Sequence, residues 1–389
     1  MVDESAVIRA HGLDPNERIT IQAELVDRTG ASWVSRADFI ADGQGTVDAS
    51  KQAPSAGSYH ELSPMGLIWS MRPTAKDVNV YMPPEHFDPQ TIRFELLCKG
   101  APVSTAELQQ VWLADGIRQI KLEGALHGVL FEPAIGPHPG VLVLGGSEGG
   151  APLRPAMWLA SHGYAALALP YFRYEGLPQK LQAIPLEYFG QALAWMKTRS
   201  EILSDHIGVM GTSRGGELAL QLGAMYPSIK TVVAFVPANT RHGACCGNTN
   251  VRYAWTWKGL PLVHLLRPDE HDPAVIMQAT IDVEHTHGPI LVISGTDDKI
   301  WDSTSMADAV VARLKQSHFP YPFEHLSYPH AGHRAGHPAI TPAWHGTVRH
   351  PVSGKPENYG GSAEGDALST LDAIPKVLQF LERGLADSQ

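Results

Sequence analysis

The chain has 389 residues, a length that predicts one large domain or two ordinary ones. Hydrophobic residues make up 43% of it and charged residues 18%, which is typical of a packed globular protein and excludes extensive disorder. The net charge of −10 argues against nucleic acid or an anionic membrane surface as a partner.

The beginning of the chain, Met1 to Ser5, has neither the basic nor the apolar region of a secretory signal. The apolar runs are far shorter than a membrane span requires. Of the three cysteines, Cys98 stands alone, whereas Cys245 and Cys246 are adjacent, and such a set does not describe a disulfide framework. We therefore expect a reduced, cytoplasmic protein without a membrane span.

Short alternating segments, separated by turn residues, fill the chain from about Ile19 to Leu97. Residues 19–26 alternate like a half-buried strand, and residues 78–82 and 91–97 repeat the pattern after Pro-rich breaks. No long helical period appears there. Short strands at this spacing predict a small antiparallel sandwich, which we place at residues 1–122.

After residue 122 the pattern changes to buried strands that alternate with helical stretches such as residues 186–196. The expected strands are residues 140–144, 165–169, 207–210, 231–236 and 289–294. This alternation predicts a mostly parallel sheet with helices on both faces over residues 123–389. Residues 242–287 fit the rhythm poorly, so they form either an insertion beside the site or a long surface excursion.

The segment from Gly211 to Gly215 satisfies G-x-S-x-G with Ser213 at its centre. An apolar run precedes it and the helical pattern of residues 217–222 follows it. This strand, sharp turn and helix predict the nucleophile elbow of an α/β-hydrolase. The alternatives are an ordinary helix cap and a phosphate loop, but the phosphate-loop pattern G-x-x-x-x-G-K-[ST] is missing.

A serine nucleophile needs an adjacent base, and the base needs a carboxylate that orients it. In this fold class the chain order is Ser, then Asp or Glu, then His. The strand at residues 290–293 ends just before Asp297 and Asp298, and either could supply the acid while the other forms the turn or caps the next helix.

The candidate base is His333, which follows a glycine in a short loop after an expected strand. His330 and His337 are close competitors. Together with His325 these residues could also be interpreted as a zinc site. Because H-E-x-x-H is absent and no cysteine flanks the cluster, we expect no metal.

The glycine-rich run of residues 145–150 follows the strand at residues 140–144. Such a loop can turn a backbone N–H towards the carbonyl oxygen of a substrate, and we assign Ser147 to that role. The N–H of Arg214, the residue after the nucleophile, is the second candidate oxyanion donor. A dinucleotide-binding loop is the rival interpretation, but G-x-G-x-x-G fails at Gly145.

With these residues in place, the chain resembles the type I acyl-CoA thioesterases and the bile acid-CoA:amino acid N-acyltransferases. The segments that carry the resemblance are residues 63–73, 171–178, 186–189 and 211–218. The resemblance implies an N-terminal immunoglobulin-like sandwich followed by an α/β-hydrolase domain. It also implies that Asp298 is the acid and His333 the base, and it matches Trp301 to a family tryptophan just after the acid.

The implied reaction is hydrolysis of an acyl-CoA thioester through an acyl-enzyme, with coenzyme A as part of the substrate and no separate cofactor. The amino-acid-conjugating members of the family use Cys as the nucleophile, so Ser213 favours hydrolysis over transfer. The alternatives are an acyltransferase that uses an amine or alcohol acceptor, and a carboxylesterase. Residues 241–267 show little of the family pattern, so we expect substrate choice to reside near them. The sequence does not indicate the acyl chain or the oligomeric state.

Overall fold

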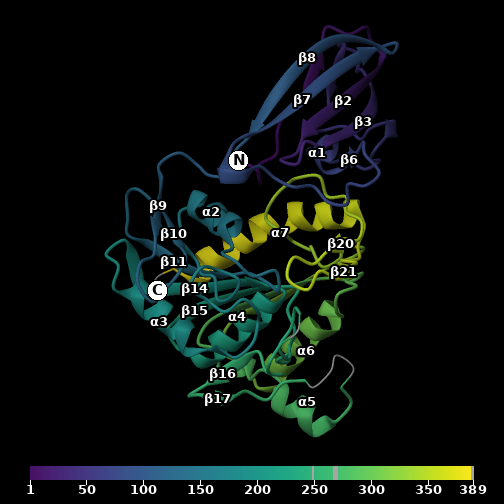
Figure 1. The fold of residues 1–389 in the computed structure, drawn as a ribbon. Helices are drawn as coiled ribbons and strands as arrows, with labels where there is room; N and C mark the ends of the chain where they lie inside the picture. The colour runs from purple at the N-terminus through teal and green to yellow at the C-terminus, as the bar shows by residue number, and fades with distance from the viewer. Residues whose placement is uncertain (248, 266–269, 387–389) are drawn as a thin grey trace.

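A computed structural model of the chain describes residues 1–247, 249–265 and 270–386. An all-β N-terminal part sits against one side of a larger α/β part, next to helices α2 (Leu153–Ser161) and α7 (Ala363–Gly384) (Figure 1). The sequence prediction of an all-β region followed by a mostly parallel α/β region is therefore confirmed at this level.

The N-terminal part contains a six-stranded sheet with the order β5-β3-β2-β7-β8, in which β6 pairs with β3. These strands are β2 (Arg18–Val26), β3 (Ser32–Ile40), β5 (Ala56–Gly57), β6 (Arg72–Pro73), β7 (Gln90–Cys98) and β8 (Ala101–Gln110). All the pairs are antiparallel. A two-stranded ribbon of β1 (Arg9–His11) and β4 (Thr46–Asp48) and the short helices α1 (Gly66–Trp69) and η1 (Glu85–Phe87) accompany the sheet.

The strand predicted at residues 78–82 is not a strand of this sheet. Val80 makes a single antiparallel bridge with His345 of the α/β part instead. Pro83 and Pro84 follow the segment directly and have no N–H to donate, so a ladder could not continue past Met82. Residues 78–82 therefore connect the two parts of the chain.

The large sheet has eight strands in the order β19-β18-β15-β14-β11-β12-β10-β9. They are β9 (Ile117–Lys121), β10 (Val129–Pro133), β11 (His138–Leu144), β12 (Ala165–Ala168), β14 (Ile202–Thr212), β15 (Ile229–Phe235), β18 (Ile290–Gly295) and β19 (Phe323–Tyr328). The six strands from β19 to β12 run parallel, and β10 and β9 are antiparallel additions. The chain thus enters this sheet at Ile117, shortly before residue 122.

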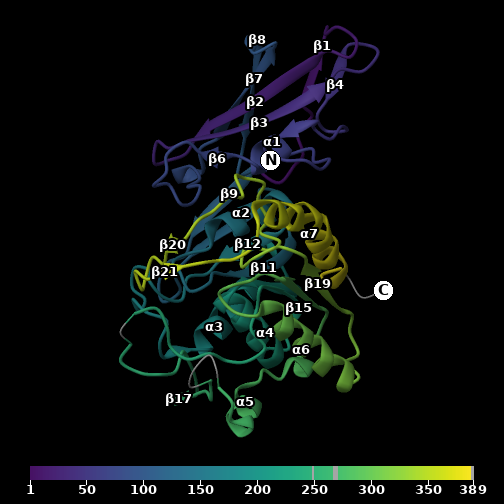
Figure 2. The same cartoon turned by 90° about the vertical axis from the view of Figure 1, so that its right-hand side faces the viewer.

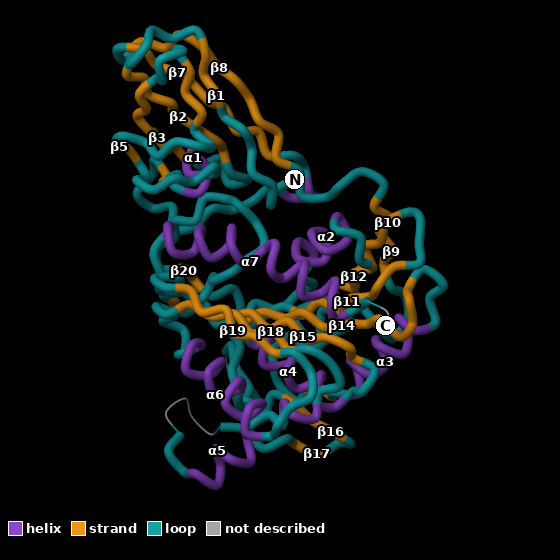
Figure 3. The backbone as a smooth tube through the Cα atoms, turned by 180° about the vertical axis from the view of Figure 1, so that it is seen from behind, coloured by secondary structure: helices purple, strands orange, loops and turns teal. Residues whose placement is uncertain are grey.

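Helices cover both faces of the large sheet (Figure 3). On one face, Trp158 of α2 and Phe380 of α7 share a hydrophobic core with the N-terminal sheet. The other face is covered by α3 (Glu187–Lys197), α4 (Arg214–Met225) and α6 (Ser303–Gln316), whose core also includes Leu218. This layered parallel sheet, with a sharp strand-to-helix turn after β14, is the α/β-hydrolase architecture that the sequence predicts.

Residues 242–287, which do not follow the alternation of strands and helices, contain little regular structure within their described part. They hold β16 (Trp255–Trp257), β17 (Leu260–Pro261), α5 (Pro273–Ala279) and η2 (Val283–His285), and β16 pairs with β13 (Ile184–Pro185). A disulfide joins the neighbours Cys245 and Cys246, which the sequence argument for reduced thiols did not anticipate. Since the two cysteines are adjacent, the bond links no separate elements. A short pair of β20 (Val348–Arg349) and β21 (Pro356–Glu357) precedes α7.

The first residues of the chain lie at the junction of the two parts (Figure 2). Val2 is 1% exposed, and its carbonyl accepts a 2.9 Å hydrogen bond from the N–H of Ile340. The carboxylate of Asp3 accepts a 2.9 Å bond from Trp158 Nε1 and pairs with His162 Nε2 at 2.6 Å. Within the described residues, no helix has the length and hydropathy needed to cross a bilayer.

Burial opposes ionisation of Asp3, but the contacts with His162 and Trp158 outweigh it and lower the pKa of this carboxyl group below its ordinary value. We therefore expect Asp3→Ala to reduce the free energy of unfolding by about 1–3 kcal/mol near pH 7, measured by urea denaturation. A depressed folded-state pKa contributes stability that is lost as the pH falls through it. The difference from wild type should therefore shrink in acid.

The matched control is Asp77→Ala, which removes a carboxylate from an exposed turn and should leave the unfolding free energy close to that of wild type. If Asp3→Ala and Asp77→Ala unfold at the same urea concentration, Asp3 does not stabilise the junction.

Candidate active site

Ser213 occupies a sharp turn between β14 and α4. Its backbone has φ 57° and ψ −119°, a conformation that residues with a side chain rarely adopt. The N–H of Ser213 donates to the carbonyl of Phe235 at 2.9 Å, which helps to hold the turn. Gly211 and Gly215 permit it, because a Cβ on Gly211 would collide with the carbonyl of Gly215, and one on Gly215 with that of Gly145.

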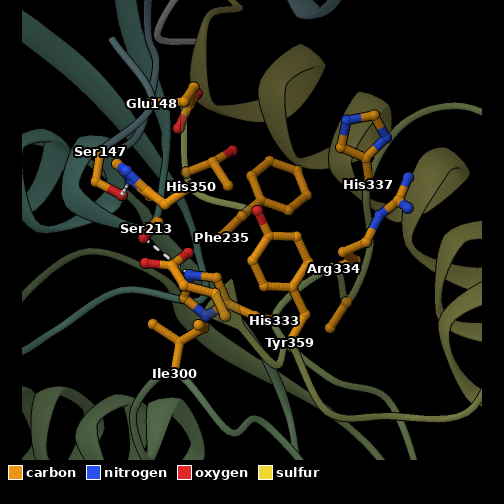
Figure 4. Close-up of a pocket in the computed structure, with 13 residues that line it drawn as sticks. Ser147, Glu148, Ser213, Phe235, Ile300, His333, Arg334, His337, His350 and Tyr359 are labelled. Carbon is orange, nitrogen blue, oxygen red and sulfur yellow. Dashed lines mark hydrogen bonds between the residues drawn. The ribbon is translucent and has the colours of Figure 1, made fainter. Parts of the chain in front are cut away.

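The side chains of Ser213, His333 and Asp298 form one hydrogen-bonded chain (Figure 4 shows the first pair). His333 Nε2 lies 2.8 Å from Ser213 Oγ, and His333 Nδ1 lies 2.7 Å from Asp298 Oδ2. The Asp298 side chain is 1% exposed, and its other oxygen accepts hydrogen bonds from the backbone N–H groups of Ile300 and Trp301 at 2.9 and 3.3 Å. Because Nδ1 faces a carboxylate, it carries the proton, and Nε2 keeps a lone pair for the serine proton.

Asp297 stabilises the turn after β18 and does not contact the His333 imidazole. It forms a 2.5 Å ion pair with Lys299 and accepts a 3.0 Å hydrogen bond from the N–H of Gly361. The hydrogen bond from Lys299 lowers the pKa of Asp297. The competing candidate base, His330, is exposed, and its backbone N–H donates to Thr296 Oγ1 at 3.1 Å. The structure thus brings Asp298 and His333 to Ser213, and not Asp297 or His330.

The remaining histidines of the cluster have separate surroundings. His325 contacts Ser294 Oγ at 2.7 Å through Nε2 and Asp308 at 2.9 Å through Nδ1. Burial, followed by the nearby charges of Arg334 and Arg154, lowers the pKa of His337 to about 3, so this imidazole is neutral at ordinary pH. In the part of the chain that the structure describes, no three His, Cys, Asp or Glu side chains are grouped to hold a metal.

A pocket of about 190 Å³ opens beside Ser213 (Figure 4). Most of its lining comes from the segment between β19 and α7, namely His333, Arg334, Ala335, His337, His350, Glu357 and Tyr359. None of the described residues between 241 and 265 lines it. The pocket therefore gives no support to the expectation that residues 241–267 govern substrate choice. Sequence reasoning missed this wall because its residues follow the expected base without any motif of their own.

Ser147 lies at the pocket beside His350, which is 3% exposed. Nδ1 of His350 accepts hydrogen bonds from the N–H groups of Val352 and Ser353 at 3.2 and 3.1 Å, so this nitrogen bears no proton. The single ring proton is therefore on Nε2, which lies 3.1 Å from Ser147 Oγ and donates to it. The hydroxyl proton of Ser147 must then point away from His350.

A buried carboxylate lies behind the other candidate oxyanion donor, Arg214. Glu217 is fully buried and accepts from Trp255 Nε1 at 2.8 Å, and it pairs with Arg214 at 3.5 Å and with His242 Nδ1 at 3.2 Å. Burial opposes its ionisation, but Arg214 and the hydrogen bonds outweigh that effect and lower the pKa of Glu217. Glu217 stands in the segment 211–218 that carries the family resemblance, but no motif in the sequence indicated its partners His242 and Trp255.

Trp301 connects this network to the base. Its ring centroid lies 5.1 Å from that of His242 and 5.6 Å from that of His333, in an edge-on arrangement with the latter. Its Nε1 donates to the carbonyl of Val236 at 3.0 Å. Trp301 therefore restricts where the His333 imidazole can turn, which accounts for a tryptophan at this position.

Two family models match the chain. The model described as "Acyl-CoA thioester hydrolase/BAAT N-terminal region" matches residues 3–124, and "BAAT / Acyl-CoA thioester hydrolase C terminal" matches residues 184–387. Acyl-coenzyme A thioesterase 1 of Mus musculus is 30% identical, over 98% of this chain and 94% of the relative. Acyl-coenzyme A amino acid N-acyltransferase 1 of Mus musculus is 32% identical, over 100% of this chain and 96% of the relative.

Solved structures show a more distant likeness. An α/β-hydrolase enzyme from a Medee basin deep-sea metagenome library is 17% identical with a TM-score of 0.43, over 70% of this chain and 99% of that one. A putative dienelactone hydrolase from Klebsiella pneumoniae is 15% identical with a TM-score of 0.44, over 69% of this chain and 98% of that one.

The neighbouring carboxylates provide a matched test of the hydrogen-bonded chain. We expect Asp298→Asn to slow covalent labelling of Ser213 by a fluorophosphonate probe by roughly 10⁴-fold, because an amide no longer fixes the His333 tautomer. Asp297→Asn makes the same change one residue away and should label at close to the wild-type rate. Labelling is followed by intact-protein mass spectrometry, with Ser213→Ala as the blank. Equal rates for the two Asn variants would show that Asp298 is not the orienting acid.

Proposed function

The chain belongs to the acyl-CoA thioester hydrolase/BAAT family, and from this premise we propose that it is a serine hydrolase that cleaves an acyl-CoA thioester. The observation that carries the proposal is the 2.8 and 2.7 Å hydrogen-bond chain from Ser213 through His333 to Asp298. Such a chain activates a hydroxyl that is otherwise a poor nucleophile. Its position beside a pocket gives a substrate carbonyl access to Ser213 Oγ.

In the proposed reaction, Ser213 Oγ attacks the thioester carbonyl while His333 Nε2 takes the hydroxyl proton. Asp298 stabilises the resulting imidazolium, and the tetrahedral intermediate places its negative charge on the former carbonyl oxygen. Collapse of the intermediate breaks the carbon–sulfur bond, and the thiol leaves with the proton from His333. Water then attacks the acyl-serine ester while His333 takes a proton from it, and His333 returns that proton to Ser213 Oγ as the ester bond breaks and the acid is released. These steps use protein groups and water, and coenzyme A enters as part of the substrate.

The oxyanion is stabilised in this proposal by the backbone N–H groups of Arg214 and Ser147. Gly146 supports the geometry, because its own N–H is engaged by Glu148 Oε1 at 3.0 Å and a Cβ on it would lie 3.3 Å from Ser213 Cβ. The hydroxyl of Ser147, turned away from His350, is a third donor for the same oxygen. Hydrogen-bond donors that are fixed before the reaction stabilise developing charge without reorganisation.

Hydrolysis is favoured over transfer because the nucleophile is Ser213. An acyl-serine ester is less reactive towards an amine than an acyl-cysteine thioester, so water is the expected acceptor. Transfer to an amine or alcohol is the alternative function, since relatives named amino acid N-acyltransferase align over the whole chain. A carboxylesterase that never meets coenzyme A is the second alternative.

The domain organisation and the location also remain part of the proposal. The sequence divides the chain at residue 122 into an immunoglobulin-like domain, residues 1–122, and a catalytic domain, residues 123–389. Because β9 (Ile117–Lys121) pairs with β10 in the large sheet, the boundary that we propose lies just before Ile117. The antiparallel sheet and the ribbon of β1 and β4 support the first assignment. The cytoplasmic location stays a prediction, since the relatives include two named mitochondrial and one named peroxisomal.

Thiol release from a panel of acyl-CoA thioesters tests the proposed function. We expect release by the wild-type protein, and a fall in kcat of roughly 10⁴- to 10⁶-fold in Ser213→Ala, because the nucleophile is lost. Adding glycine or taurine should not divert the acyl group into an amide, which mass spectrometry of the products checks. Amide formation would favour the acyltransferase, and cleavage of simple esters without any thiol release would favour the carboxylesterase.

The contribution of the Ser147 hydroxyl can be separated from that of its N–H. Ser147→Ala keeps the backbone donor, so we expect kcat to fall by about tenfold to 10²-fold with little change in KM. His350→Ala should lower kcat in the same way, since it frees the hydroxyl to rotate. The double variant should be no slower than the slower single variant, because the two residues act as a unit. An unchanged kcat in Ser147→Ala would leave the backbone N–H as the sole donor at this position.

A further inference from the structure

A second cavity of about 620 Å³ lies between the two parts of the chain and adjoins the catalytic pocket. Glu148, Thr212 and His337 line both cavities, so the two are neighbours. One wall of the second cavity is made by Arg28, Glu85 and Phe87 of the N-terminal part, and the other by the start of α2. We call it the interdomain cleft.

Arg154, in the first turn of α2, lies in the cleft without a carboxylate partner among the described residues. Its guanidinium donates to the carbonyl of Pro84 at 2.9 Å and lies 5.1 Å above the ring of Trp112. The Nε of Arg154 is buried and makes no hydrogen bond within the described chain. Arg154 is half-buried, and no carboxylate among the described residues neutralises its charge, so an anion in the cleft would pair favourably with its guanidinium.

The surroundings of Arg154 add to the positive potential. Burial, followed by repulsion from Arg28, lowers the pKa of Arg154. Among the described residues, Arg28 has one ion pair, at 3.0 Å with Glu85, but the Glu85 side chain is 63% exposed and compensates little. On the other side, the low pKa of His337 partly reflects Arg334 and Arg154, so positive charge extends towards the catalytic pocket. The positive end of the α2 dipole lies at the same wall.

We propose that the interdomain cleft binds the phosphate groups of the coenzyme A carrier, through Arg28 and Arg154, while the acyl group enters the pocket beside Ser213. This inference rests on the proposed function and extends it to the N-terminal part. The cleft volume lies within the range of ordinary ligand sites, about 300–1,000 Å³. Guanidinium groups suit phosphate because their donors match its oxygens in pairs. The carboxylate of Glu148, at the shared edge, disfavours phosphate at the catalytic end itself.

The test compares one acyl group on two thiol carriers, coenzyme A and N-acetylcysteamine, which lacks phosphate. For the wild-type protein kcat/KM should be higher with coenzyme A, and the advantage should narrow as salt is raised. Arg28→Gln and Arg154→Gln should each reduce the ratio of kcat/KM between the carriers by about tenfold, through KM, as expected for loss of a charge-assisted hydrogen bond. Arg18→Gln, an equal charge change at an exposed residue outside the cleft, should leave the ratio at its wild-type value.

A purely structural role for Arg154 gives a different result. Loss of its contacts with Pro84 and Trp112 would lower stability and slow the reaction of both carriers alike, leaving the ratio unchanged, which would overturn the proposal. Arg28→Gln keeps the test decisive if Arg154→Gln does not fold, because Arg28 lies nearer the surface.

Direct binding separates this inference from the proposed function. Titration calorimetry with coenzyme A alone requires no catalysis, and both cleft variants should weaken the affinity by about tenfold. A wild-type protein that binds coenzyme A but cleaves neither thioester would contradict only the proposed function. Equal coenzyme A affinity in the wild type, Arg28→Gln and Arg154→Gln would contradict only the proposal that the interdomain cleft binds the phosphate groups.

Discussion

The backbone turn at Ser213 is the constraint on which the rest of the site depends. Its positive φ angle projects the side chain out of the end of β14 and starts α4 at the next residue. That geometry presents the Arg214 N–H beside the hydroxyl and brings the chain against the loop after β11. The bond from Ser213 N–H to Phe235 and the absence of side chains at Gly211 and Gly215 hold the strained conformation.

Buried polar groups surround this turn and fix it from several sides. Glu217 holds Arg214 and His242, and Trp301 lies between His242 and His333. Arg214 and Glu217 lie on the same helix, whereas His242, Trp301 and His333 come from other parts of the chain. The position of the base therefore depends on the segment that contains His242 as well as on its own loop. Hydrogen-bonded polar networks of this kind rigidify a site, although Nε of Arg214 is buried without a hydrogen-bond partner among the described residues.

Local pattern predicted the fold layers and the nucleophile, because periodicity and the G-x-S-x-G turn are properties of adjacent residues. It could not separate Asp297 from Asp298, since both follow the same strand and only the fold determines which faces His333. The resemblance to a family selected Asp298, and the hydrogen bonds place it there. Contacts such as Ser147 with His350 join residues 203 positions apart and have no local signature. The strand expected at residues 78–82 was wrong because proline limits pairing.

The pocket wall from His333 to Tyr359 belongs to the same stretch of chain as the base. Substitutions in this wall that change the preferred substrate can also displace the His333 imidazole. The evolution of substrate preference is therefore constrained there. Substitutions at the junction with the N-terminal part are not linked in this way to the position of His333. A designer who wishes to change the acyl group accepted would do best to recombine residues 334–359 as one block, with the Asp298 and Ser213 loops kept unchanged.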